Sequence, residues 1–181
     1  MNPFIFLIDI LLQLYATALL IRVLLQWAGA DFYNPVSQFI VKITNPPVKP
    51  VRKIIPGFFG IDMATLVLAV LVLAIKIMLV YQTLNPVAIS LLAIGQLLML
   101  TLSIFLYSII IQAILSWVNP DPYNPAVSLL NSLTFPVLKH FRNLLPPMGG
   151  MDLSPMIAII AIMFIQYSVR YLFMNVFGIS L

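Results

Sequence analysis

Few side chains in this chain could do chemistry, and their types and spacing argue against catalysis. The sequence contains five aspartates and one histidine, His140, but no glutamate and no cysteine. A lone histidine cannot hold a metal ion without other ligands, and without cysteine there is no thiolate nucleophile. We find no Ser-His-Asp set, no carboxylate pair at catalytic spacing and no glycine-rich phosphate loop. The sequence therefore predicts a protein that is not an enzyme and carries no metal or other cofactor.

Four charged residues interrupt apolar stretches, where an unpaired charge is costly: Asp9, Arg22, Lys76 and Arg170. Two cations and one acid at similar depth make a poor ion path, so we favour pairing or snorkelling over transport. We favour a pair between Asp9 and Lys76, because runs that are neighbours in sequence usually pack side by side. Asp9 should pair with Arg170 if the first run packs against the fourth. Arg22 has three acids within reach: Asp31, Asp62 and Asp152.

The elements that position these charges must be transmembrane helices. Of 181 residues, 62% are hydrophobic and 8% charged, against about 25% charged in soluble domains. Mean hydropathy is +1.11. Four apolar runs are long enough to cross a membrane: about 4–28, 63–83, 88–117 and 155–177. We predict an all-α membrane protein of four transmembrane helices, with a tight turn joining the second and third as an antiparallel hairpin.

The two long connections, residues 29–62 and 118–154, carry the basic residues outside these runs. The positive-inside rule places both connections in the cytoplasm, and the termini and short turn on the opposite side. Basic residues beside apolar runs suit anionic lipid and give no sign of nucleic-acid binding. Five of them are expected to form a surface for lipid or a partner protein: Lys49, Arg52, Lys53, Lys139 and Arg142.

An internal repeat is the strongest pattern in the sequence. With a shift of 90 residues, positions 27–62 match 117–152 at 12 of 36 sites without a gap. We predict two tandem helix–loop–helix units, residues 1–87 and 88–181, related by a pseudo-twofold axis along the membrane normal. The matched pairs include Trp27 with Trp117, Asn34-Pro35 with Asn124-Pro125, and Asp62 with Asp152. The tryptophans end their runs, as membrane-interface anchors do.

Both long connections should contain amphipathic interfacial helices. Asn-Pro is a helix-starting pair, because asparagine caps and proline suits the first turn. Apolar residues then follow at helical spacing, beginning with Val36, Phe39 and Ile43. We expect proline to break these helices, at Pro46 and Pro136. Contact with the lipid surface is favoured over the alternative, in which each helix packs on its own spans with a solvated basic face.

The repeated polar pattern resembles the YggT family of bacterial inner-membrane proteins, called YlmG in Gram-positive bacteria. The second unit adds Asp152-Leu153-Ser154-Pro155, similar to that family's Asp-Leu-Ser-Pro, whereas the first departs to Asp62-Met63-Ala64-Thr65. The resemblance implies a multi-pass inner-membrane protein linked to cell division, envelope organisation or osmotic and potassium stress. Chloroplast relatives assist haem attachment to a cytochrome. The family supplies no catalytic residues.

The first functional hypothesis is a non-enzymatic scaffold or assembly factor, with the paired basic loops as its working surface. The alternative is a small ion-transport or osmoregulatory protein that uses the cleft between repeats, motivated by Lys76 and Arg170. Haem handling is a third, weakened because His140 is the only histidine. Expected partners are anionic membrane lipids and other membrane proteins, including a second copy of this chain.

Overall fold

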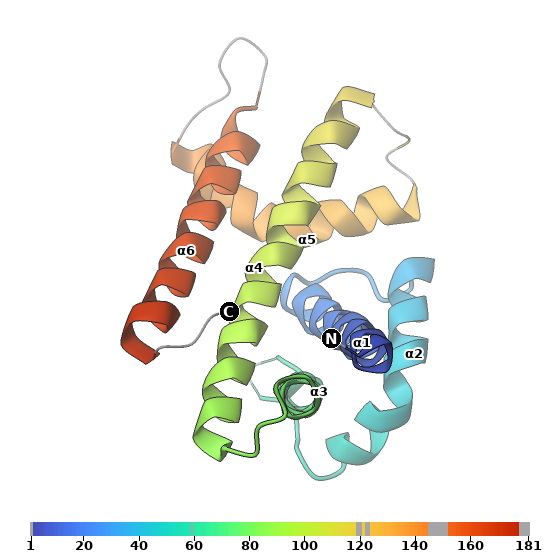
Figure 1. Ribbon diagram of the computed structural model, residues 1–181. Helices are drawn as coiled ribbons and strands as arrows, with labels where there is room; N and C mark the ends of the chain where they lie inside the picture. Colours follow the sequence, from blue (N-terminus) through green and yellow to red (C-terminus); the bar gives the residue numbers. More distant parts are fainter. Residues whose placement is uncertain (1, 59, 119–120, 122–123, 145–151, 178–181) are drawn as a thin grey trace.

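The computed structural model is all-helical and describes residues 2–58, 60–118, 121, 124–144 and 152–177, with the backbone alone at 117. Figure 1 shows the helices in chain order. Within the described residues there are six, and no β-strand: α1 (Pro3–Trp27), α2 (Pro35–Arg52), α3 (Met63–Tyr81), α4 (Pro86–Val118), α5 (Pro125–Leu144) and α6 (Ser154–Phe177).

Four of the six helices, α1, α3, α4 and α6, are long and apolar enough to cross a membrane. Their ends follow local capping chemistry. The Asn2 side chain accepts from the amide of Phe4 and Pro3 occupies the first turn of α1, while Asp62 caps α3. Gln82, with φ of 50°, ends α3 in the left-handed conformation and starts the short turn into α4. The four predicted spans are therefore confirmed, with bounds that shift by a few residues.

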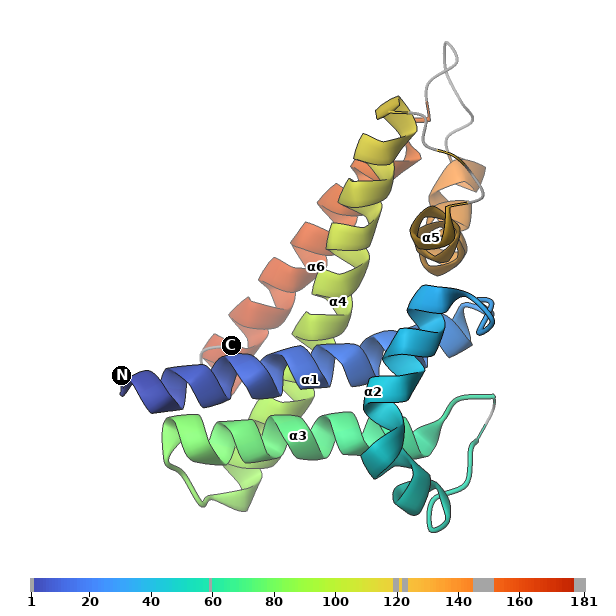
Figure 2. The ribbon, with the colours of Figure 1, turned by 90° about the vertical axis from the view of Figure 1, so that its right-hand side faces the viewer.

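The spans form two pairs. α1 packs beside α3, and α4 packs beside α6. The two pairs cross obliquely and meet where α4 contacts α3 (Figures 1 and 2). α2 lies across α1 and α3, and α5 lies across α4 and α6. The first span therefore packs beside the second, α3, as expected from their order in the sequence.

The two units repeat their internal packing. In the first unit, Leu19, Val48 and Ala69 form a fully buried cluster that joins α1, α2 and α3. In the second, Ile109 and Leu138 occupy the positions 90 residues later and pack with Ala158 of α6. Lipid gives helices no hydrophobic reason to associate, so close van der Waals packing at small residues such as these alanines must hold them together.

The expected break at proline is wrong. α2 runs through Pro46, Pro47 and Pro50, and α5 runs through Pro136. Figure 2 shows that α2 changes direction along its length, as a proline-kinked helix does. Proline removes one helical hydrogen bond but does not end a helix whose two halves are both held by packing. Here Thr44 and Val48, on either side of the first proline, are both fully buried.

The contacts between the two units follow the expected pseudo-twofold axis only in part. The equivalent helices α2 and α5 touch each other, as do α1 and α4, but other contacts lack a counterpart. Leu129 and Leu133 of α5 are buried against Leu20 and Leu24 of α1. The equivalent pairing would be α2 against α4, and no such contact occurs among the described residues. The corresponding apolar residues of α2, Phe39 and Ile43, are exposed instead. The interface between the units is therefore asymmetric where α5 packs on α1.

Candidate functional site

The polar centre of the first unit is Asp62, which directly precedes α3. Its carboxylate accepts hydrogen bonds from the amide of Thr65 at 3.4 Å and from the Thr65 hydroxyl at 2.5 Å. Arg52, at the end of α2, donates to both carboxylate oxygens. Only 4% of the Asp62 side chain is exposed. The carboxylate thus caps one helix and ties it to the end of another.

Arg22 of α1 reaches the same carboxylate. Its Nη1 donates to Thr44 Oγ1 at 2.7 Å and to Asn45 Oδ1 at 3.0 Å, both on α2. Its Nε lies 3.8 Å from an Asp62 oxygen, and its side chain is 6% exposed. Two guanidinium groups, from Arg22 and Arg52, therefore share one carboxylate. Asp31, Asp62 and Asp152 were the predicted partners of Arg22, and in the structure the partner is Asp62.

The second unit keeps the ion pair and loses the buried guanidinium. Arg142 Nε lies 2.8 Å from Asp152 Oδ2, and the amide of Ser154 donates to Asp152 Oδ1 at 2.9 Å. Both charged side chains are about two-fifths exposed. At the position of Arg22 stands Gln112, whose Nε2 donates to Asn131 Oδ1 at 3.0 Å. The arginine–aspartate pair is common to both units, and the extra buried cation belongs to the first.

Both aspartates have a pKa below the ordinary carboxyl value. Burial alone would raise the pKa of Asp62, but hydrogen bonds from Arg52 and Thr65 and the Arg52 charge outweigh it. Burial likewise opposes the shift at Asp152, where hydrogen bonds from Ser154 and Arg142 hold the pKa down. Both carboxylates are therefore ionised at neutral pH.

Acid should destabilise the folded protein through these two aspartates. A carboxyl whose folded pKa is depressed contributes stability above its unfolded pKa, and that stability is lost as the pH falls through the folded pKa. We expect the unfolding temperature in detergent to fall as the pH drops below about 4, the ordinary value for aspartate. The variant Asp62→Asn/Asp152→Asn should show a much flatter profile. An unchanged acid response in that variant would assign the loss to other groups.

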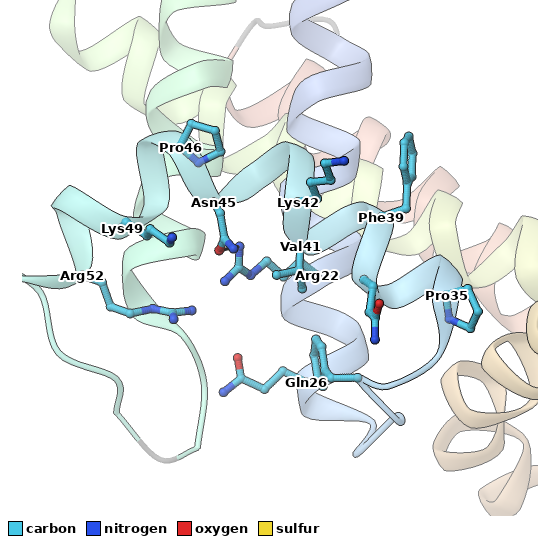
Figure 3. A pocket seen from close by; sticks show the side chains of 12 residues that line it. Arg22, Gln26, Pro35, Phe39, Val41, Lys42, Asn45, Pro46, Lys49 and Arg52 are labelled. Carbon is cyan, nitrogen blue, oxygen red and sulfur yellow. Dashed lines mark hydrogen bonds between the residues drawn. The ribbon is translucent and has the colours of Figure 1, made fainter.

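A wide, basic groove lies between the last turns of α1 and the length of α2. Its volume is about 1150 Å³. Figure 3 shows Arg22, Asn45 and Arg52 near one another, with Gln26 beside them. Four cations and several amide and apolar side chains line the groove: Arg22, Gln26, Phe32, Pro35, Gln38, Phe39, Val41, Lys42, Asn45, Pro46, Lys49 and Arg52.

A second polar cluster lies within the spans. Lys76 Nζ of α3 is 3.2 Å from Asp9 Oδ1 of α1, so the expected ion pair is the one that forms. The same nitrogen donates to Gln13 Oε1 at 2.6 Å and to Gln96 Oε1, on α4, at 3.4 Å. Lys76 of α3 is thus bound by side chains from two other helices, α1 and α4. This arrangement explains how the charge is accommodated in an apolar segment.

The second unit has a neutral version of this cluster. Gln166 stands where Lys76 does, and its Nε2 donates to Ser103 Oγ at 3.1 Å. Ser103 in turn occupies the position of Gln13. Arg170 is exposed on α6 and makes no ion pair within the described segments, so Asp9 is not its partner.

The five cations expected on one surface are placed differently from one another. Lys49 and Arg52 line the groove, with Arg52 also bound to Asp62. Arg142 is engaged with Asp152. Lys53 and Lys139 are exposed. The structure thus brings only two of the five together in one concave site.

The repeated motif residues mostly build helix starts. Asn34 and Asn124 each accept from the amide two residues later, at 2.9 Å, before the prolines that open α2 and α5. The Asn34 side chain also donates to the carbonyl of Pro125 at 2.7 Å, which joins the two units. Pro155 lies in the first turn of α6, after the buried Ser154.

The two tryptophans share a place in the repeat, but only one can be described. Trp27 is half exposed at the end of α1 and packs edge-on against Phe105, with ring centres 6.0 Å apart. The side chain of Trp117 lies outside the described residues. The role of the two tryptophans as membrane-interface anchors stays a prediction.

Several site residues escaped the sequence analysis. Gln13 lies one helical turn after Asp9, so its i, i+4 spacing could have indicated a shared face. Thr44 is identical to its equivalent in the second unit, Thr134, but its role depends on the hydrogen bond that Arg22 of α1 donates to it. Asn45 and Gln96 have no counterpart in the pattern, because their roles depend on how α2 and α4 pack. Within the described residues no cluster of three or more histidine or acidic side chains could hold a metal ion.

Comparison with known proteins agrees with the resemblance. The CCB3/YggT family profile matches residues 1–83 and again residues 91–173. An uncharacterized protein of Pseudomonas aeruginosa is 46% identical over 168 residues, covering 90% of this chain and 85% of its own length. The uncharacterized protein YggT of Escherichia coli K12 is 37% identical over 170 residues, covering 93% and 90%. No solved structure matches. The chain therefore belongs to the CCB3/YggT family.

Proposed function

We propose that this protein is a non-enzymatic scaffold or assembly factor of the bacterial inner membrane, with α2 and α5 as its working surface. The supporting observation is that these two loop helices lie in contact, joined by the Asn34–Pro125 hydrogen bond of 2.7 Å. Figure 2 shows both at the same side of the molecule, away from the start of α1. Because the two basic helices meet at their first turns (Figure 1), they form a surface that neither unit could present alone. Envelope organisation or cell division is the setting in which such a surface would act.

The two loop helices differ in how much of their apolar face is exposed, which suggests different roles. α5 buries Leu129, Leu133 and Leu138 inside the molecule, although Phe135 and Leu144 are exposed. α2 leaves Val36, Phe39 and Ile43 exposed, beside its lysines. An exposed apolar stripe flanked by cations suits the headgroup region of an anionic membrane. The apolar stripe of α2 would therefore contact lipid, while the exposed polar side chains of both loops, Lys53 and Lys139 among them, would face a partner protein.

The polar contacts of Lys76 favour this proposal over ion transport. A transport path needs polar groups that are free to bind and release an ion. Lys76 instead has Asp9, Gln13 and Gln96 as partners. Reconstituted protein should therefore give no potassium or proton flux above empty liposomes. A flux abolished by Lys76→Met would replace the scaffold proposal with an osmoregulatory one.

Site-specific photo-crosslinking in the native membrane tests the scaffold directly. A photo-reactive residue at Lys53 or Lys139, one in each loop and both exposed, should capture the same partner proteins. The exposed Leu84, in the turn between α3 and α4, is the matched control and should not capture them. Adducts that form only at the control position, or different partners for the two loops, would contradict a shared surface.

Membrane topology provides a separate prediction. Because the cations outside the spans lie in the two long connections, we expect both connections in the cytoplasm and both termini on the other side. Reporter fusions placed after residue 53 and after residue 181 should report opposite sides. A cytoplasmic signal from the fusion at residue 181 would invert the orientation and place the loop surface on the side of the membrane opposite the cytoplasm.

A further inference from the structure

We propose that the groove between α1 and α2 is a binding site for a phosphate group, and that this site exists only in the first unit. The site is formed by Arg22, Lys42, Lys49 and Arg52, with apolar walls at its edge. The ligand is a phosphate-bearing anion, either the headgroup of an anionic phospholipid or a soluble phosphate compound. This inference deepens the lipid contact proposed for α2, and calorimetry with phosphate probes tests it separately from the capture of partner proteins by the loops.

The charges of the groove are not balanced by the protein. Arg22 and Arg52 share the carboxylate of Asp62, which leaves one positive charge in excess at that point. Lys42 and Lys49 are exposed and form no ion pair or side-chain hydrogen bond within the described segments. The groove thus carries about three positive charges more than its contacts neutralise. A phosphate group could supply the missing negative charge, since guanidinium forks and lysine ammonium groups are its usual ligands.

The groove also offers neutral donors and an apolar wall. Asn45 uses its carbonyl oxygen to accept from Arg22, and its amide NH₂ donates to no other group within the described segments, so it could donate to a ligand. Phe39 is 61% exposed beside the cations, and Phe32 is also exposed. A volume of about 1150 Å³ is at or above the upper end of ordinary small-molecule sites, roughly 300–1000 Å³. These walls and this size favour a phosphate joined to an apolar group.

The second unit provides an internal comparison. Its equivalents of Arg22, Lys42 and Asn45 are Gln112, Ser132 and Phe135. Lysine and arginine persist at the other two positions, Lys139 and Arg142. The retained pair therefore serves the architecture common to both units, in which arginine meets aspartate. The residues confined to the first unit are those that convert this architecture into an anion site.

The test uses purified full-length protein in a zwitterionic detergent. The probes are short-chain phosphatidylglycerol, short-chain phosphatidylcholine, glycerol phosphate and inorganic phosphate, with binding followed by calorimetry. The variant Lys42→Gln/Lys49→Gln removes two exposed groove cations and spares the buried Arg22. The control Lys53→Gln/Lys139→Gln removes the same charge from exposed positions outside the groove. Circular dichroism and gel filtration check that each variant is folded.

Wild-type protein should bind phosphatidylglycerol saturably and phosphatidylcholine at least tenfold more weakly. The groove variant should weaken phosphatidylglycerol binding by about thirtyfold, because each lysine near an anionic group contributes about fivefold. The control variant should change it less than about threefold. Saturable binding of glycerol phosphate or inorganic phosphate would identify the phosphate group alone as sufficient, whereas binding of phosphatidylglycerol only would identify a lipid site. Absence of saturable binding to all probes, or equal losses in the two variants, would overturn the proposal.

Discussion

Replacing Asp62 with asparagine is expected to destabilise the protein far more than the same change at Asp152. Asparagine still caps a helix, so the substitution removes the charge and keeps most of the cap. At position 62 the loss leaves Arg22 buried with no acid and Arg52 without its partner. Removing one member of a buried charge pair costs about 3–5 kcal/mol, because the other charge stays in a poorly solvating environment.

Asp152 is the matched control, because its pair has the same layout in an exposed setting. Arg142 and Asp152 are about two-fifths exposed, and the position of Arg22 is held by the neutral Gln112. An exposed pair contributes about 0–1 kcal/mol, so Asp152→Asn should shift the unfolding free energy by about that amount.

Unfolding by denaturing detergent, followed by helical circular dichroism, measures both variants against wild type. A third variant, Asp62→Asn/Arg22→Gln, copies the neutral arrangement of the second unit and should regain part of the loss. Equal losses at positions 62 and 152 would show that the buried arginine does not depend on Asp62.

The parts of the fold that follow from local chemistry could be predicted from the sequence. The four spans follow from length and hydropathy, and the starts of α2 and α5 follow from the Asn-Pro pairs, where asparagine caps the following amides. The equivalence of the two units follows from the 90-residue shift. In each case the deciding interaction lies within a few residues of the pattern that predicts it.

The parts that failed are those decided by packing across the molecule. Phe39 and Leu129 occupy equivalent positions in nearly identical helical patterns, yet one is exposed and the other buried. The difference comes from how the second unit docks on α1, which no local periodicity records. The prolines of α2 were misread for a similar reason, since Thr44 and Val48 hold the helix on both sides of them.

The charged members of the candidate site were predictable from the sequence, but its neutral members and its geometry were not. Arg22 was recognised as a buried charge, and three acids were within reach of it in the sequence. Selecting Asp62 requires the path of the chain from α2 to α3, which brings Arg52 to the same carboxylate. The groove itself needs α2 to lie across α1, so its cations could not be separated beforehand from those on the open surface.

Replacing Asp9 with asparagine is expected to cost about 2–3 kcal/mol of unfolding free energy, the scale for a charge left within a span. The carboxylate of Asp9 is the acid that faces Lys76, at 3.2 Å. Gln13 and Gln96 would still accept from the ammonium, so the loss should stay below that of a fully orphaned charge. Removing the cation as well, in Asp9→Asn/Lys76→Met, should recover more than half of the loss, because the uncompensated charge is then gone.

The second unit has neutral residues at the positions equivalent to Asp9 and Lys76. This difference provides a second test of the ion pair. Its residues equivalent to Asp9, Gln13 and Lys76 are Met99, Ser103 and Gln166, with Gln166 donating to Ser103 at 3.1 Å. The triple variant D9M/Q13S/K76Q copies this neutral arrangement into the first unit. We expect its stability to lie within about 1 kcal/mol of wild type, since a satisfied neutral hydrogen bond is close to neutral overall when it replaces a satisfied ion pair. Strictly additive losses in the double and triple variants would show that Asp9 and Lys76 are not coupled. A triple variant that folds normally and yet fails to complement a deletion strain would show instead that the charge pair serves the protein's activity, beyond holding α1 against α3.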